Sequence, residues 1–259
     1  MVLVCNGDSW TQGDSSSQRV RWEVKDNELS DDYQIMENFS DPYTEHGRRI
    51  TYKFYTSPVW PKVLGKSLEV KTYNTGRLGR SNYDIAISTI KAVNTLLEEG
   101  VKDIFVVVGW SSLLRKNIFC YNGKSDRPIP LQIRPLTEGF EHVYENILSL
   151  EDAFANNIYL TQQYLTSKGI DFLFFNAFDT FTNFKNTQVG NTIDKTKWLN
   201  EDITSSHFLD FLNQHSIENG IEIVDTSQDT DYLVSHHPTD KSHKLWGSYL
   251  SQKIVNKVK

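Results

Sequence analysis

Short, continuous apolar runs alternate with helical patterns along this 259-residue chain, and this alternation limits its possible folds more than any other feature. The runs at 2–5 and 103–108 lack the polar alternation of a strand with one wet face, so they predict strands buried on both faces. Further short strands are expected at 69–73, 171–176 and 221–224. Strands of this kind with helices between them predict an α/β fold, in which helices cover both faces of a parallel sheet of about five strands.

The segments between these apolar runs show the periodicity of helices. A stripe of apolar residues, spaced i, i+4, i+7 and i+11, runs through 86–97 and predicts a helix that ends before Gly100. Other helices are expected at about 150–167, 205–219 and 238–258.

Three segments do not fit the alternating pattern and are expected to be insertions in a single domain that spans residues 1–259. They lie near 14–57, 112–149 and 178–201, and each follows the carboxyl end of an expected strand. The prolines in the second segment exclude one long helix there. Long loops in compact domains are commonly lids or binding loops, although surface decoration is the plain alternative.

The composition narrows the class of protein and its partners. A net charge of −6 is unfavourable for binding nucleic acid, and no apolar run reaches the ~20 residues that span a bilayer. The two cysteines are too few for a disulfide framework or a metal cluster. A polar turn at 7–9 stands where a secretory signal would need its apolar region. We therefore expect a cytoplasmic protein without metal or cofactor, or a protein carried by a virus particle if a phage encodes the chain.

The turn after the first strand, Gly7-Asp8-Ser9, has two interpretations. In the first, Asp8 or Ser9 caps the next helix, which is the better interpretation of the tripeptide alone. In the second, Ser9 is a reactive group, since open α/β sheets place such groups at the carboxyl ends of their strands. A serine hydroxyl then needs a base to take its proton and donors for the oxyanion that it forms.

Suitable groups follow the other expected strands. Gly79 opens the segment "GRSN" before a helix, and Ser111 follows the strand that Gly109 ends. Histidines 236, 237 and 243 stand near the start of the last helix. Each signal is weak by itself, but their order along the chain and their places at strand ends favour a reactive Ser9.

This pattern resembles the SGNH (GDSL-type) hydrolase superfamily, whose members are ester hydrolases with a flavodoxin-like, three-layer α/β fold. The likeness spans nearly the whole chain, with spacings stretched by the three insertions. Gly7-Asp8-Ser9 with Gly13 matches the first block, which implies that Ser9 is the nucleophile and that its N–H is one oxyanion donor.

The resemblance also implies further oxyanion donors. Gly79 in "GRSN" is implied to be the second donor, through its backbone N–H. The third donor of the family is an asparagine, whereas this chain has Ser111 at that place. The third donor is therefore a shorter hydroxyl or comes from elsewhere, with Asn82 as one source.

The resemblance leaves two alignments of the last block open. In the alignment that we favour, His237 stands before a proline at the mouth of the last helix and is the base. The aspartate of the family is then missing, so a backbone carbonyl, Asp231 or Asp229 would orient the imidazole. In the other alignment, Asp240 and His243 match the Asp-x-x-His spacing of the family and form the catalytic pair.

The implied reaction is hydrolysis of an ester through an acyl-enzyme on Ser9, most simply the removal of an acetyl group from a carbohydrate. Aromatic side chains would form a sugar-stacking rim: Trp10, Trp22, Tyr33, Tyr43, Trp60, Trp110 and Trp198. No insertion is apolar enough for the lid of a lipid esterase. A lysophospholipase or thioesterase, and a non-catalytic glycan-binding protein on the same scaffold, are the alternatives. The expected partner is a small-molecule or glycan ester, and assembly as a homo-oligomer or with a virus particle stays open.

Overall fold

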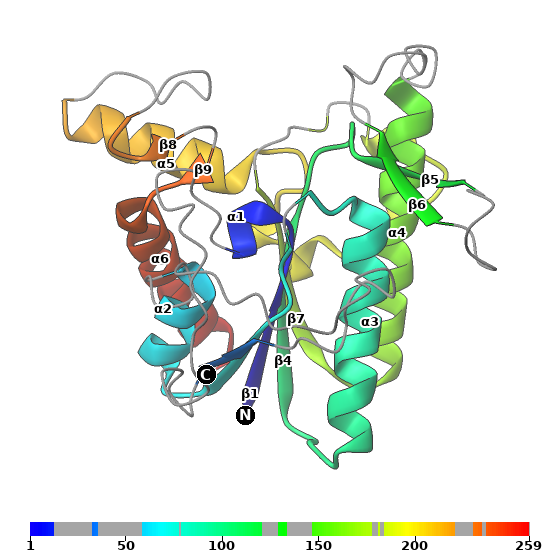
Figure 1. Cartoon of the computed structure of the whole chain (residues 1–259), viewed down its shortest axis with the longest axis horizontal. Coiled ribbons are helices and arrows are strands. Elements are labelled where there is room, and N and C mark those ends of the chain that lie inside the picture. The colour runs from blue at the N-terminus through cyan, green and yellow to red at the C-terminus, as the bar shows by residue number, and fades with distance from the viewer. Residues whose placement is uncertain are drawn as a thin grey trace.

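Five parallel strands form the central sheet, in the order β2-β3-β1-β4-β7 (Figure 1). Their bounds are Val2–Asn6 (β1), Tyr33–Ile35 (β2), Lys71–Asn74 (β3), Ile104–Trp110 (β4) and Asp171–Asn176 (β7). The computed structural model describes residues 1–12, 33–35, 59–77, 79–120, 129–133, 147–177, 181, 184–220, 230–234 and 237–258. Apart from β2, the strand order is flavodoxin-like, because the first strand lies between the second and the third. The expected parallel α/β fold is confirmed.

Helices cover both faces of this sheet and give the fold three layers (Figure 1). One face packs against α3 (Asn82–Glu98) and α4 (Ile147–Ser167), and the other packs against α2 (Trp60–Leu68), α5 (His207–Glu218) and α6 (Asp240–Val258). Successive residues of a strand alternate between the two cores, as a period of two requires. Within the described ranges, no helix combines the length and the apolar content needed to cross a membrane.

The element bounds differ from the sequence expectations at a few places with a clear physical reason. Glu69 adopts the left-handed conformation (φ 55°) at the end of α2, so β3 begins only at Lys71. Pro238 pairs with Leu233 in a small antiparallel hairpin, so the last helix begins at Asp240 rather than at the proline. The strand expected at 221–224 lies outside the described residues.

The three expected insertions contain several elements that the repeating pattern did not predict. The first contributes strand β2 at the sheet edge. The second contains an antiparallel hairpin of β5 (Lys116–Cys120) and β6 (Ile129–Ile133) and the start of α4. The third contains short 3-10 turns, with bounds Phe184–Asn186, Gly190–Thr192, Lys195–Lys197 and Leu199–Glu201. The hairpin of β8 (Leu233–Val234) and β9 (His237–Pro238) lies just before α6.

Candidate active site

The turn after β1 confirms the capping interpretation for Asp8, while the reactive role of Ser9 stays a prediction. A Cβ on Gly7 would stand 2.1 Å from Oγ1 of Thr11, so the turn is too tight for any larger residue. Asp8 is the cap, because its Oδ1 accepts the N–H of Trp10 at 2.9 Å. Ser9 is therefore the first residue of the short helix α1 (Ser9–Gln12), with its side chain available for another contact.

That contact is with a histidine from the far end of the chain. Nε2 of His237 lies 3.0 Å from Oγ of Ser9, within hydrogen-bond distance. His237 belongs to β9, which contacts α1 directly and lies 228 positions along the chain from Ser9. Ser9 is fully buried and His237 is half-buried. A neutral imidazole with its proton on Nδ1 accepts the serine proton in this arrangement, as an activated nucleophile requires.

His243, the other candidate base, has a different set of contacts. His243 is buried in α6, and its Nδ1 accepts the N–H of Trp60 at 3.3 Å. Burial lowers the pKa of His243 to about 3, and the neighbouring charge of His237 adds to this shift. His243 is therefore neutral and joins α6 to α2, while Asp240 is the first residue of α6. Of the two candidate bases, His237 is the one in contact with Ser9, and His236 lies outside the described residues.

The structure also places one of the candidates for orienting His237. The side chain of Asp231 is 74% exposed, and its Oδ2 lies 3.5 Å from Nζ of Lys241. Its carboxylate therefore faces solvent and a lysine at the surface. Asp229, the other candidate, lies outside the described residues.

Gly79, the expected second oxyanion donor, stands between β3 and α3 at the carboxyl edge of the sheet. It adopts the left-handed conformation, with φ 74°, which a glycine takes without strain. Two residues later, Ser81 caps α3 in a capping box with Asp84. The conformation of Gly79 is thus that of a tight turn into a helix, and its role as a donor stays a prediction.

Ser111 and Asn82, the expected sources of the third donor, bind each other, and Ser111 also binds Asp8. The backbone N–H of Ser111 donates to Oδ1 of Asn82 at 2.8 Å, and Nδ2 of Asn82 donates back to the carbonyls of Ser111 and Ser112 at 3.0 and 3.3 Å. The hydroxyl of Ser111 donates to Oδ2 of Asp8 at 2.8 Å. In this arrangement both side chains use their protons to hold the end of β4 against α3 and the turn after β1.

One further residue of this network has no counterpart among the sequence candidates. Nη1 of Arg115 lies 2.5 Å from Oδ2 of Asp8 and 2.9 Å from Oγ of Ser111. The Asp8 side chain is fully buried, whereas that of Arg115 is 25% exposed. A buried carboxylate in the turn that carries Ser9 requires a cation or several donors, and that requirement is the only signal that could have led to Arg115.

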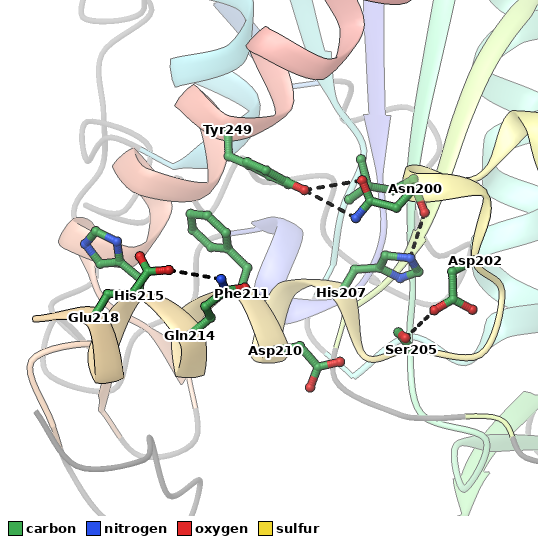
Figure 2. A pocket seen from close by; sticks show the side chains of 11 residues that line it. Asn200, Asp202, Ser205, His207, Asp210, Phe211, Gln214, His215, Glu218 and Tyr249 are labelled. Atoms are coloured by element: carbon green, nitrogen blue, oxygen red, sulfur yellow. Dashed lines mark hydrogen bonds between the residues drawn. The ribbon is translucent and has the colours of Figure 1, made fainter.

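A second cluster of serine, histidine and aspartate lies in a cavity of about 320 Å³ between α5 and α6 (Figure 2). Nδ1 of His207 accepts the N–H of Asn176 at 3.2 Å, so Nε2 carries the proton and donates to the carbonyl of Leu199 at 2.9 Å. The hydroxyl of Ser205 donates to Asp202 instead of to the histidine. Both ring nitrogens of His207 are therefore engaged with the backbone.

The expected aromatic rim is wrong for the tryptophans that the structure describes. Trp10 is 4% exposed, and Trp60, Trp110 and Trp198 are 0% exposed. They pack edge-to-face against core phenylalanines such as Phe175, because large aromatic rings contribute most to a core when fully buried. Trp22, Tyr43 and the side chain of Tyr33 lie outside the described residues.

No family profile and no curated protein sequence matches the chain. Solved structures that resemble it include a G-D-S-L family protein from Desulfitobacterium hafniense, with 17% identity, a TM-score of 0.39 and coverage of 97% of this chain and 98% of that one. Another is a carbohydrate esterase whose active site displays divergent catalytic and non-catalytic binding functions, with 12% identity, a TM-score of 0.43 and coverage of 98% and 64%.

A third is the α/β hydrolase LAE5 from the metagenome of Lake Arreo, with 11% identity, a TM-score of 0.36 and coverage of 96% of this chain and 92% of that one. All three TM-scores are below 0.5. A conclusion about function must therefore come from the residues of this chain.

Proposed function

We propose that this chain is a serine hydrolase that cleaves esters through an acyl-enzyme on Ser9. The observation that carries the proposal is the distance of 3.0 Å between Oγ of Ser9 and Nε2 of His237. A serine at the carboxyl edge of a parallel sheet, in hydrogen-bond contact with an imidazole, has the two groups that nucleophilic catalysis needs first.

In the proposed mechanism, His237 takes the Ser9 proton while Oγ attacks the ester carbonyl. The backbone N–H groups of Ser9 and Gly79 hold the oxyanion of the tetrahedral intermediate. His237 then gives its proton to the departing alcohol, and water releases the acyl group from Ser9 by the same route. Because Ser9 is fully buried, binding of the ester requires a local opening around its side chain.

The preferred substrate is an ester of a small acyl group, acetyl, with a polar alcohol such as a carbohydrate hydroxyl. The side chains that hold Asp8, the residue directly before Ser9, are polar: Ser111 and Arg115 contact its carboxylate, and Asn82 binds the backbone of Ser111. A long acyl chain would need an apolar channel next to Ser9. Two cavities, of about 320 and 390 Å³, lie away from Ser9, between α5 and α6 and at the amino-terminal edge of the sheet.

The test compares hydrolysis of p-nitrophenyl acetate, p-nitrophenyl octanoate and an acetylated xylo-oligosaccharide by the wild type and by Ser9→Ala. We expect hydrolysis of both acetyl esters by the wild type, a loss of about 10⁴-fold or more in Ser9→Ala, and a lower kcat/KM for the octanoate. Equal rates in the two proteins would contradict the proposal and favour a non-catalytic binding protein. A preference for the octanoate would contradict the choice of acyl group and leave the serine mechanism intact.

A further inference from the structure

We propose that Arg115 is a positioning residue that neutralises the charge of Asp8 and so allows an oxyanion to form beside Ser9. The inference rests on the proposed function of Ser9 and adds a residue to it. It starts from Asp8, whose carboxylate is fully buried and belongs to the residue directly before the nucleophile.

The contacts of Asp8 are divided between its two oxygens. Oδ1 accepts the N–H of Trp10 at 2.9 Å, which fixes the first turn of α1. Oδ2 accepts from Nη1 of Arg115 at 2.5 Å and from the hydroxyl of Ser111 at 2.8 Å. The same Nη1 donates to the Ser111 hydroxyl at 2.9 Å, so the three side chains form a closed triangle. This geometry holds the carboxylate, and with it the turn that carries Ser9, against the end of β4.

The charge of the carboxylate matters for the proposed reaction because the negative charge of the oxyanion would form at the turn that carries both Asp8 and Ser9. A buried carboxylate without a cation would repel this charge through a medium of low dielectric. The guanidinium of Arg115 supplies the compensating positive charge in direct contact with Oδ2 of Asp8. Because Arg115 is partly exposed, the desolvation free energy of its cation is small. Arg115 thus acts through Asp8 and needs no contact with the substrate.

This role makes a specific prediction about paired substitutions. Arg115→Gln leaves the Asp8 charge uncompensated and should lower kcat by about 100-fold, the order of effect of losing one electrostatic contribution to an oxyanion. KM should change by less than about threefold, because the charge develops only in the transition state. Asp8→Asn in the Arg115→Gln background removes the charge that Arg115 neutralises, and should therefore restore kcat at least about tenfold. Arg115→Lys keeps the cation and should stay within about tenfold of the wild type.

The experiment measures kcat and KM for p-nitrophenyl acetate in the wild type, Arg115→Gln, Arg115→Lys and Asp8→Asn/Arg115→Gln. The rate of Ser9 labelling by a fluorophosphonate and the thermal unfolding midpoint are measured on the same samples. An unchanged kcat in Arg115→Gln, or a double variant that is no faster than Arg115→Gln, would overturn the inference while the serine mechanism stands. A purely structural role would lower the unfolding midpoint in all variants without restoring kcat in the double variant, and would overturn it as well.

The labelling rate separates the two proposals. If the wild type hydrolyses no ester but Ser9 still reacts with the fluorophosphonate, the proposed function fails. The labelling rates of the variants then show whether Arg115 neutralises Asp8 as proposed. The inference is supported if labelling is fastest in the wild type, slower in Arg115→Lys, slower still in the double variant and slowest in Arg115→Gln. If the wild type shows neither hydrolysis nor labelling, both proposals are overturned.

Discussion

Two regions of this molecule combine serine, histidine and acidic side chains, and they use them in opposite ways. In the first, the imidazole of His237 lies 3.0 Å from the hydroxyl of Ser9. In the second, the imidazole of His207 binds the backbone N–H of Asn176 and the carbonyl of Leu199. The hydroxyl of Ser205 there donates to Asp202 (Figure 2). The second region is beside an open cavity, whereas Ser9 is fully buried.

The comparison teaches that residue types and a nearby cavity do not by themselves bring a serine hydroxyl into contact with an imidazole. What separates the regions is the number of ring nitrogens that the protein backbone already uses. Burial lowers the pKa of His207, so its ring stays neutral, with the proton on Nε2 committed to the Leu199 carbonyl. Such a ring joins α5 to β7 and to the turn at Leu199, and has no lone pair left to accept a serine proton.

The largest effect should come from removing the imidazole of the first region. His237→Ala should lower kcat/KM for p-nitrophenyl acetate by about 10⁴-fold, because Ser9 then lacks its base. The matched control is His243→Asn, in which Oδ1 of the asparagine replaces Nδ1 as acceptor of the Trp60 N–H. The control should keep kcat/KM within about tenfold. A loss of activity in His243→Asn but not in His237→Ala would reverse our assignment of the base.

His243 lies between the two regions, packed on Phe208 of α5, and it should make stability depend on pH. Its pKa is about 3 in the folded protein, against about 6.5 in an unfolded chain. The unfolded state therefore binds the proton more tightly, and stability falls as the pH falls from about 6.5 towards 3. Between pH 7 and about pH 4.5 this group should remove about 3 kcal/mol from the free energy of unfolding.

Urea unfolding of the wild type and His243→Asn at these two pH values measures the effect. The wild type should lose about 3 kcal/mol more than the variant, since all other titrating groups are common to both. Parallel losses in the two proteins would show that His243 is not buried as a neutral ring.

The smallest effect on activity should come from the second region. His207→Asn keeps an acceptor for the N–H of Asn176 but loses the hydrogen bond to Leu199. We expect a loss of about 1–2 kcal/mol in the free energy of unfolding and a kcat within about threefold of the wild type. A kcat reduced as strongly as in His237→Ala, with the fold intact, would contradict the distinction between the two regions.

The sequence predicts the sheet well because its buried strands are continuous apolar runs. The strand expected at 171–176 has the same bounds as β7, and the helix expected at 150–167 ends at the same residue as α4. Helix α2 was not predicted, since a nine-residue helix with Gly65 in its middle shows little periodicity.

The candidate site is predictable only in part. Ser9 could be found from its place after β1, because such turns recur in open α/β sheets. The buried Asp8 predicts a cation but not which one, because the contact with Arg115 joins residues 107 positions apart and no local pattern marks it. The aromatic rim was wrong because composition does not tell whether a ring such as Trp110 packs inside the core or stands at a rim.

The most direct test of the account locates the reactive serine. The wild-type protein is treated with a fluorophosphonate and digested, and the modified peptide is identified by mass spectrometry. We predict a single adduct on Ser9, strongly slowed in His237→Ala and unaffected in His207→Asn. An adduct on Ser205, or a Ser9 peptide that stays unmodified while the protein hydrolyses esters, would contradict the claim that Ser9 and His237 form the reactive pair.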